Sequence, residues 1–211
     1  MPTGDPFKRI QRLKKSEPKR RQGESEKERV PPGQYVTQKF PVLTYGETPQ
    51  IDLKSWRLKV WGQVEHPFEL TWEAFKALPR AKIHTDIHCV TRWSLLDTEW
   101  EGVPFRVIAE KARPLPAAVA VMEHAYGGYT TNMLLQELMD EDVLLADTYN
   151  GQPLEVEHGG PVRLVVPKLY FWKSAKWLRG LEFLDKNVPG FWEQYGYHMH
   201  GDPWAEERFA F

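Results

Sequence analysis

Hydrophobic and polar residues alternate along this chain in short stretches that glycines and prolines separate. Residues 56–61 alternate apolar and basic side chains, which predicts a half-buried strand that ends at Gly62. Further strands are predicted at 81–89 and at the mostly apolar stretch 162–166, which Pro167 ends. The chain is therefore expected to contain several short strands.

Short helices are predicted between the strands. Thr71 can cap a helix that stops before Pro79, and Pro104 suits the first position of a helix that runs to about Lys111. Residues 133–139 predict a third short helix. Two more strands are predicted at 119–122 and 143–146, and a hairpin turn at Asn150-Gly151. Without a regular βαβ alternation, this mixture predicts a single α+β domain of mixed β-sheets with short surrounding helices.

Residues 1–30 differ from the rest of the chain in charge. They contain ten Lys or Arg and five Asp or Glu, a balance of +5, whereas the remaining 181 residues carry −6. Apolar residues are also sparse there, so residues 1–30 are predicted to form a basic, flexible N-terminal arm. Turn residues begin at Pro31, and residues 31–211 are predicted to form the folded domain.

Composition narrows the class of protein. A single cysteine excludes an internal disulfide and fits a reducing compartment. No apolar run approaches the roughly 18 residues of a membrane span, and the first thirty residues lack the apolar segment of a secretory signal. The sequence therefore predicts a cytoplasmic protein without a membrane span. The net charge of −1 gives no reason to expect nucleic acid as a partner.

The one cysteine, Cys89, stands at the end of the strand predicted at 81–89. Because alternate side chains of a strand share a face, His84, Asp86 and His88 should point one way and Cys89 the other. Arg92 follows closely and could help to keep the sulfur as a thiolate, the form that acts as nucleophile or metal ligand. A small buried apolar side chain is the alternative interpretation of a lone cysteine.

Three later stretches combine the groups that bind anions: guanidinium, ammonium, hydroxyl and backbone N–H. The first is His158-Gly159-Gly160-Pro161-Val162-Arg163, where two glycines allow a close approach of the backbone. The second, 168–177, places three lysines and Ser174 among aromatic residues, and the third is His124 before a Gly-Gly loop. Each feature alone has a structural explanation, and only their combination suggests an anion site.

The chain resembles the molybdopterin-binding domain of the sulfite oxidase superfamily, in particular the stand-alone bacterial domains related to the methionine-sulfoxide reductase catalytic subunit. Three segments carry the resemblance, in the order of that family: His88-Cys89-Val90-Thr91, His158-Gly159-Gly160-Pro161-Val162-Arg163 and Lys173-Ser174-Ala175-Lys176-Trp177. The resemblance implies that Cys89 binds molybdenum as a thiolate, consistent with the preference of soft ligands for such metals. It also implies the residues that hold the pterin and its phosphate: Gln38, Lys39, His124, His158, Arg163, Ser174, Ala175 and Lys176.

The resemblance further implies two-electron chemistry, in which an oxygen atom passes to or from a sulfite-like oxyanion or a sulfoxide. Arg92, near Cys89, would then be a catalytic residue that steers an anionic substrate. The sequence has no c-type haem motif, and one cysteine cannot ligate an iron-sulfur cluster. A separate haem or flavin protein is therefore expected to exchange the electrons.

Two other classes of protein remain open at this point. A zinc enzyme could use His84, Asp86 and His88, with His198 or His200 as a further ligand. A non-catalytic phosphate-binding or nucleotide-binding module would explain the anion-binding stretches but would leave Cys89 without a role. Metal analysis separates the three classes, because they predict molybdenum, zinc and no metal respectively.

Overall fold

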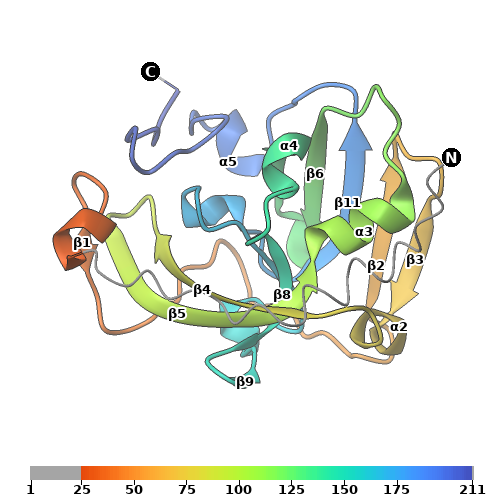
Figure 1. The fold of residues 1–211 in the computed structure, drawn as a ribbon, viewed down its shortest axis with the longest axis horizontal. Coiled ribbons are helices and arrows are strands. Elements are labelled where there is room, and N and C mark those ends of the chain that lie inside the picture. Colours follow the sequence, from red (N-terminus) through yellow and green to blue (C-terminus); the bar gives the residue numbers. More distant parts are fainter. Residues whose placement is uncertain (1–24, 211) are drawn as a thin grey trace, which may run out of the picture.

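Strand β5 (Trp93–Pro104) runs through the centre of one of two β-sheets in the computed structural model, which describes residues 25–210 (Figure 1). It pairs in antiparallel fashion with β4 and β8 and in parallel with β1. The six strands of this sheet are β1 (Tyr35–Val36), β4 (Ala81–His88), β5, β8 (Leu144–Tyr149), β9 (Gln152–Pro153) and β10 (Arg163–Val165).

The second sheet has five strands in the order β3-β2-β11-β6-β7 and stands at the right of Figure 1. Its strands are β2 (Arg57–Gly62), β3 (Phe68–Thr71), β6 (Ala120–Ala125), β7 (Thr130–Leu134) and β11 (Leu178–Leu184). β11 pairs in parallel with β2 and in antiparallel fashion with β6, so both sheets are mixed. The predicted fold class, one α+β domain of mixed sheets with short helices, is confirmed.

The helices are short and connect the strands. The α-helices are α2 (Trp72–Lys76), α3 (Phe105–Ala112), α4 (Leu135–Leu138) and α5 (Phe191–Gln194). The 3₁₀ turns are η1 (Glu26–Arg29), η2 (Tyr126–Gly128), η3 (Val156–His158) and η4 (Phe171–Lys173). α3 crosses the five-stranded sheet in Figure 1, and its Phe105 stacks on Phe183 of β11 with ring centroids 6.1 Å apart.

Two apolar clusters fill the interior. The larger one joins α3 to the five-stranded sheet through fully buried side chains such as Leu58, Ile108 and Phe183. The smaller one lies on the six-stranded sheet around Trp93 and Trp100 and includes Cys89. Because Cys89 belongs to this second cluster, the surrounding packed side chains hold the candidate reactive sulfur in a fixed position.

The observed elements match the hydrophobic pattern in most places and differ in two. The Thr71 cap is present, since its side chain accepts a hydrogen bond from the Ala74 N–H at 3.2 Å. The helix predicted at 133–139 is wrong in its first half, because β7 continues to Leu134 before α4 begins. β5 itself, the longest of the described strands, was not predicted.

The predicted N-terminal arm lies mostly outside the described residues. Its last part, residues 25–30, contains η1, and the Arg29 guanidinium pairs with Asp86 at 2.5 Å and with Asp97 at 2.9 Å. Asp86 belongs to β4, so this ion pair fastens the start of the described chain to the strand that leads to Cys89.

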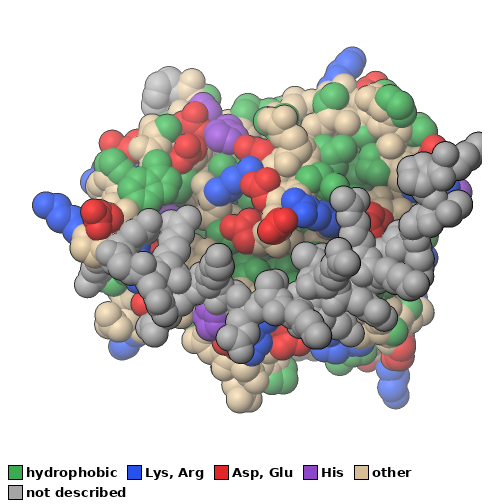
Figure 2. All heavy atoms as spheres, viewed as in Figure 1, with side chains coloured by type: hydrophobic (Ala, Val, Ile, Leu, Met, Phe, Trp, Pro, Cys, Tyr) green, Lys and Arg blue, Asp and Glu red, His purple; other side chains and the backbone are tan. Residues whose placement is uncertain are grey.

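The outer surface is mixed in charge. Acidic and basic side chains lie beside one another on the face shown in Figure 2. Ion pairs such as Lys168–Asp140, at 2.7 Å, bring opposite charges together in this way. Between residues 25 and 210 no helix is both long enough and apolar enough to cross a bilayer.

Gly62 ends β2 at a close approach to the backbone of β11. Its φ is 92°, and a Cβ atom there would lie 2.1 Å from the Phe183 carbonyl oxygen. We expect Gly62→Ala to lower the free energy of unfolding by about 3 kcal/mol, since the backbone must move to admit the methyl group. Gly46 also has a positive φ, of 79°, but has no atom within 4 Å of the added Cβ. Gly46→Ala is the matched control and should cost about 1 kcal/mol; equal urea midpoints for the two variants would contradict the steric argument.

Candidate active site

Cys89 lies in a tight turn that leads from β4 into β5. The Arg92 N–H donates to the Cys89 carbonyl, and the Cys89 N–H donates to the Trp93 carbonyl, both at 2.9 Å. The Cys89 side chain is buried, and the Thr91 hydroxyl donates to its Sγ at 3.2 Å. Burial raises the pKa of the Cys89 thiol. A positively charged ligand at the sulfur would reverse this effect and stabilise the thiolate.

Two cavities lie near β4 and the turn that follows it. Cys89 lines a cavity of about 390 Å³, whereas His84, Asp86 and His88 line a second one of about 400 Å³. Thr85, which lies between His84 and Asp86, lines the second cavity as well, so the separation of Cys89 from the three residues does not follow from strand alternation alone. Asp86 is paired with Arg29, and the His88 Nδ1 lies 2.8 Å from the Ser94 hydroxyl. The second cavity is therefore lined by side chains that already have partners.

The residues proposed for zinc do not form a metal site. His84 lies 3.2 Å from Glu99, and the two nitrogens of His200 lie 2.6 Å from Glu137 and Glu207. Across residues 25–210 no group of three or more His, Cys, Asp or Glu side chains is arranged to hold a metal ion. The geometry thus gives no support to the zinc alternative.

The two later motifs of the sequence lie side by side. The Leu164 N–H donates to the Ala175 carbonyl at 3.0 Å, and the Trp177 N–H donates to the Gly159 carbonyl at 3.1 Å. A Cβ atom on Gly159 would lie 2.9 Å from the Cβ of Lys176. Gly159 thus makes room for the lysine side chain of the same protein, which is a different role from the close ligand approach that the sequence suggested.

Arg163 is buried, with 2% of its surface exposed, and projects toward the cavity from β10. Its guanidinium donates to the carbonyls of His158 at 2.6 Å and Ser174 at 2.8 Å, and lies 4.0 Å from the centroid of the Phe171 ring. Burial lowers the pKa of Arg163 to about 9. Its hydrogen-bond partners among the described residues are neutral oxygens, and the buried carboxyl of Glu123 acts on it electrostatically without a hydrogen bond to it.

Lys176, like Arg163, donates its hydrogen bonds to neutral oxygens. Its ammonium donates to the Leu43 carbonyl at 2.8 Å, the Thr44 hydroxyl at 2.6 Å and the Glu157 carbonyl at 3.0 Å. Burial, and then the charge of Arg163, lowers the pKa of Lys176 to about 8.

The His158 ring lies against the same cavity. It stacks on Phe40 with ring centroids 3.9 Å apart and an interplanar angle of 6°. Burial lowers the pKa of His158. A neutral imidazole, held flat by the aromatic ring, therefore stands beside the two cations at neutral pH.

The cavity thus combines one thiol with two cations that lack carboxylate partners. Its volume falls in the range of roughly 300–1,000 Å³ that is usual for pockets that bind small molecules or cofactors. Arg163 is buried and Lys176 is half-buried, and neither cation makes an ion pair with a carboxylate among the described residues, so an anion bound at both would be stabilised. A soft metal carried by an anionic organic group satisfies the thiol and the cations together, so the residues present fit a molybdenum pterin phosphate.

Not every residue that the sequence suggested reaches this cavity. His158, Arg163, Ser174, Ala175 and Lys176 line it together with Cys89. The others lie outside it: Gln38 and Lys39 are exposed, Arg92 is exposed in the turn after Cys89, and the His124 Nε2 lies 3.0 Å from Glu182 in the other sheet. Their predicted contacts with the cofactor or substrate have no counterpart in the cavity lining.

Aromatic residues form much of the remaining wall, and the sequence did not assign them to the site. Those lining the cavity are Phe40, Tyr45, Trp93, Tyr129, Phe171, Trp172, Trp177, Trp192 and Tyr197. Trp192 and Tyr197 come from the C-terminal stretch 191–204, which is rich in aromatic residues. Burial, and then proximity to Cys89, raises the pKa of Tyr197, so its hydroxyl keeps its proton at neutral pH.

One thiol and two cations without hydrogen-bonded carboxylates surround one cavity. They define a site for an anionic group that also carries a ligand partner for the cysteine sulfur. The sequence profile of the oxidoreductase molybdopterin binding domain matches residues 45–192. Because this match covers most of the chain, the chain belongs to that family. The predicted relation to the molybdopterin-binding domains of the sulfite oxidase superfamily is confirmed, and membership implies a molybdenum cofactor.

Several known proteins are similar to this chain. The uncharacterized oxidoreductase YuiH of Bacillus subtilis is 54% identical over 183 residues, which cover 86% of this chain and 92% of that protein. The protein-methionine-sulfoxide reductase catalytic subunit MsrP of Gluconobacter oxydans is 28% identical over 172 residues; the match covers 70% of this chain and 54% of MsrP. This chain therefore matches about half the length of MsrP.

The fold is also found among solved structures. The sulfane dehydrogenase SoxCD from Paracoccus pantotrophus superposes with a TM-score of 0.61 at 26% identity. The superposition covers 66% of this chain and 40% of the SoxCD chain.

Anion binding to the cofactor-free chain should depend on pH through Lys176. Below its pKa of about 8 the ammonium is charged and attracts an anion, and above that value the charge is lost while Arg163 keeps its own up to about 9. We expect the affinity for sulfate, whose charge is constant in this range, to fall about tenfold as the pH rises through 8. Titration calorimetry measures this change. Lys176→Met should bind more weakly and without the step near pH 8; the same step in both proteins would assign it to another group.

Proposed function

We propose that this protein is a molybdenum-cofactor-dependent oxidoreductase that transfers an oxygen atom to or from sulfur in a small substrate. The observation that carries the proposal is the placement of Cys89, Arg163 and Lys176 around one cavity, with no carboxylate bonded to either cation among the described residues. Residues 31–211 would form the catalytic domain.

Each lining residue has a definite task in this proposal. The cofactor, when bound, supplies two-electron oxygen-atom transfer at the metal. Cys89 would ligate the metal as a thiolate, which becomes stable once the metal replaces the proton. Arg163 and Lys176 would hold the anionic pterin phosphate, Ser174 and Ala175 would line its binding segment, and the stacked imidazole of His158 would contact it without adding charge.

Tyr197 and Trp192 would act on the substrate side of the cavity. A protonated Tyr197 hydroxyl can donate a hydrogen bond to the oxygen that is transferred. The indole of Trp192, whose ring centroid lies 5.1 Å from that of Tyr197, covers this side and excludes water. These two residues come from the same C-terminal stretch, so they would be placed together.

The lining favours a neutral sulfoxide over a sulfite-like oxyanion. Among the described lining residues the only Lys and Arg side chains are Lys176 and Arg163, and the proposed cofactor phosphate would occupy both. Arg92, which was expected to steer an anionic substrate, lies outside the cavity. Reduction of a sulfoxide consumes two electrons and two protons and releases the sulfide and water, so a separate haem or flavin protein would have to supply the electrons.

The test is metal and pterin analysis combined with an assay. The full-length chain should contain molybdenum and a pterin that becomes fluorescent on acid oxidation. With a reduced dye as electron donor it should reduce small sulfoxides faster than it oxidises sulfite. Zinc, or neither metal nor pterin, in chain expressed in cells that make the cofactor would overturn the proposal. Faster turnover of sulfite would overturn the preference for sulfoxide alone.

A further inference from the structure

A fully buried ion pair lies next to residues that line the cavity. The Lys173 ammonium is 2.7 Å from the Glu193 Oε1, and both side chains have no exposed surface. Lys173 ends η4 and Glu193 belongs to α5, so the pair joins two segments that are twenty residues apart in sequence. Lys173 stands in the motif that resembles a cofactor-binding segment, yet it is not among the residues that line the cavity.

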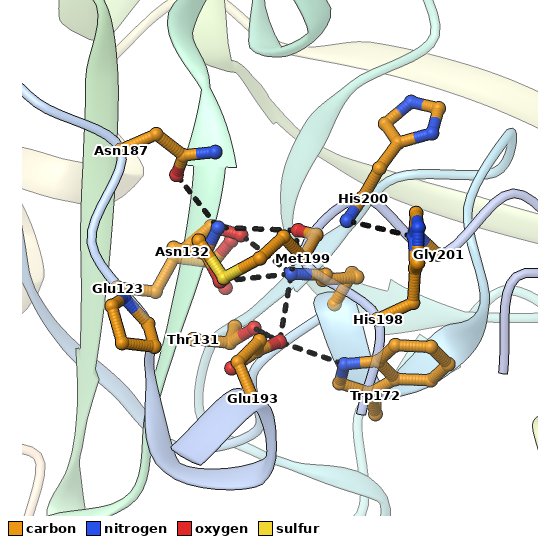
Figure 3. A network of polar contacts seen from close by, with 12 residues as sticks. Glu123, Thr131, Asn132, Trp172, Asn187, Glu193, His198, Met199, His200 and Gly201 are labelled. Atoms are coloured by element: carbon orange, nitrogen blue, oxygen red, sulfur yellow. Dashed lines mark hydrogen bonds and ion pairs between the residues drawn. The ribbon is translucent and has the colours of Figure 1, made fainter. Parts of the chain in front are cut away.

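The Lys173 ammonium is fully bonded. Besides Glu193, it donates to the Asn132 side-chain oxygen at 2.9 Å, the Asn132 carbonyl at 3.1 Å and the Met199 carbonyl at 2.6 Å. These acceptors come from β7, α5 and the segment after α5. One charged group thus holds three separate parts of the chain together (Figure 3).

The Glu193 carboxylate also accepts hydrogen bonds from two other side chains. Its Oε1 accepts from the Trp172 indole N–H at 2.9 Å and from the Thr131 hydroxyl at 3.1 Å, and Figure 3 shows these side chains converging on it. Trp172 lines the cavity and immediately precedes Lys173. The network is therefore continuous with the cavity wall.

The residues next to the pair are those that face the cavity. Ser174, Ala175 and Lys176 follow Lys173, while Trp192 precedes Glu193. Tyr197 packs against both indoles, with ring centroids 5.3 Å from Trp172 and 5.1 Å from Trp192. The anion-binding segment and the aromatic wall are thus fastened to each other through Lys173 and Glu193.

We propose that the Lys173–Glu193 pair is a positioning device that closes the aromatic wall of Trp192 and Tyr197 over the cavity and so restricts access to Cys89. A buried charge that loses its partner is strongly unfavourable, so removal of either group should release the C-terminal segment from η4. That restricted access protects a metal centre at Cys89 rests on the proposed function. The closure of the cavity itself does not.

Cys89 provides the readout, because it is the only cysteine of the chain. The rate at which a maleimide labels it in the full-length chain, purified from cells that make no pterin cofactor, reports how often the cavity opens. We expect Lys173→Met to raise this rate about tenfold or more, and Glu193→Gln to raise it less, because the amide oxygen can still accept from Trp172 and Thr131.

Two further variants separate positioning from general stability. In Lys173→Met/Glu193→Gln both charges are gone, so labelling should be slower than in Lys173→Met alone. Asp147→Asn removes another buried carboxylate, paired with Arg80 at 2.5 Å and outside the cavity lining. It should lower the urea midpoint to a similar degree but leave the labelling rate within about twofold of the parent.

The outcomes decide the proposal in either direction. Labelling of Lys173→Met at the rate of Asp147→Asn, or a double variant that labels faster than Lys173→Met, overturns it. If Lys173→Met does not fold, the labelling rates of Glu193→Gln and Asp147→Asn are compared instead, and equal rates overturn the proposal. A chain without pterin in cofactor-producing cells would refute the proposed function but would leave these labelling rates to stand by themselves.

Discussion

Cys89→Ser should reduce the proposed oxygen-atom transfer about a thousandfold or more, because a hard hydroxyl would replace the soft sulfur that we propose as the metal ligand. The cations that would hold the pterin phosphate are untouched by this change, so the variant should still retain much of the pterin. The measurements are turnover with a sulfoxide, molybdenum and pterin content, and the spectrum of the metal. Loss of activity with pterin retained is the expected combination.

Thr91→Val is the matched control for Cys89→Ser. It removes the hydroxyl that donates to the Cys89 Sγ at 3.2 Å but keeps the sulfur and the shape of the turn. We expect a decrease of about tenfold, as is usual when a hydrogen bond to a metal ligand is lost. Full activity of Cys89→Ser would show that the sulfur is not the metal ligand, whatever the protein's cofactor content.

The part of the site that could be predicted from sequence is the part carried by short local segments. Arg163 and Lys176 stand in compact motifs, and direct backbone pairing between those motifs brings them to one cavity. The walls could not be predicted in this way. Trp192 and Tyr197 reach the cavity because the Lys173–Glu193 pair and ring packing place their segment there, and such long-range contacts leave no periodic pattern in the sequence.

The position of His124 also depends on long-range pairing. A histidine before a glycine-rich loop suits an anion site, but β6 belongs to the sheet away from Cys89, and its register sets His124 opposite Gly180 of β11. The ring then packs on Trp61, with centroids 5.0 Å apart, and pairs with Glu182. Strand pairing decides which face a side chain occupies, and the pairing is not visible in the local sequence.

The same limit applies to the fold. The alternating stretch 56–61 and the Asn150-Gly151 turn were predictable because pattern and turn chemistry agree locally. β5 was not, since its register against β4 shifts between Thr85 and Ile87 and Asp97 adopts a φ of 57°. Such an irregularity breaks the alternation by which strands are found.

Arg163→Met should lower the affinity for the cofactor about a hundredfold or more, because the variant removes a buried, fixed guanidinium that faces the cavity. The effect on the cofactor-free chain should be smaller. The carbonyls of His158 and Ser174 lose their donors, at about 1–3 kcal/mol each, but a buried charge that has no carboxylate hydrogen-bonded to it disappears as well and offsets part of this cost. The lost hydrogen bonds and the removed charge therefore partly cancel in the stability of the cofactor-free chain.

Pterin retained after dialysis and the urea midpoint of the cofactor-free chain measure these two effects of Arg163→Met separately. Arg179→Met is the control, since Arg179 is exposed on β11 and its guanidinium contacts the Tyr126 ring rather than the cavity. We expect parental pterin content in Arg179→Met and almost none in Arg163→Met, with midpoints that differ far less than the pterin contents. If Arg163→Met kept its pterin, the Arg163 guanidinium would serve only to bond the carbonyls of His158 and Ser174. The anion would then have to be held by Lys176 and backbone N–H groups alone.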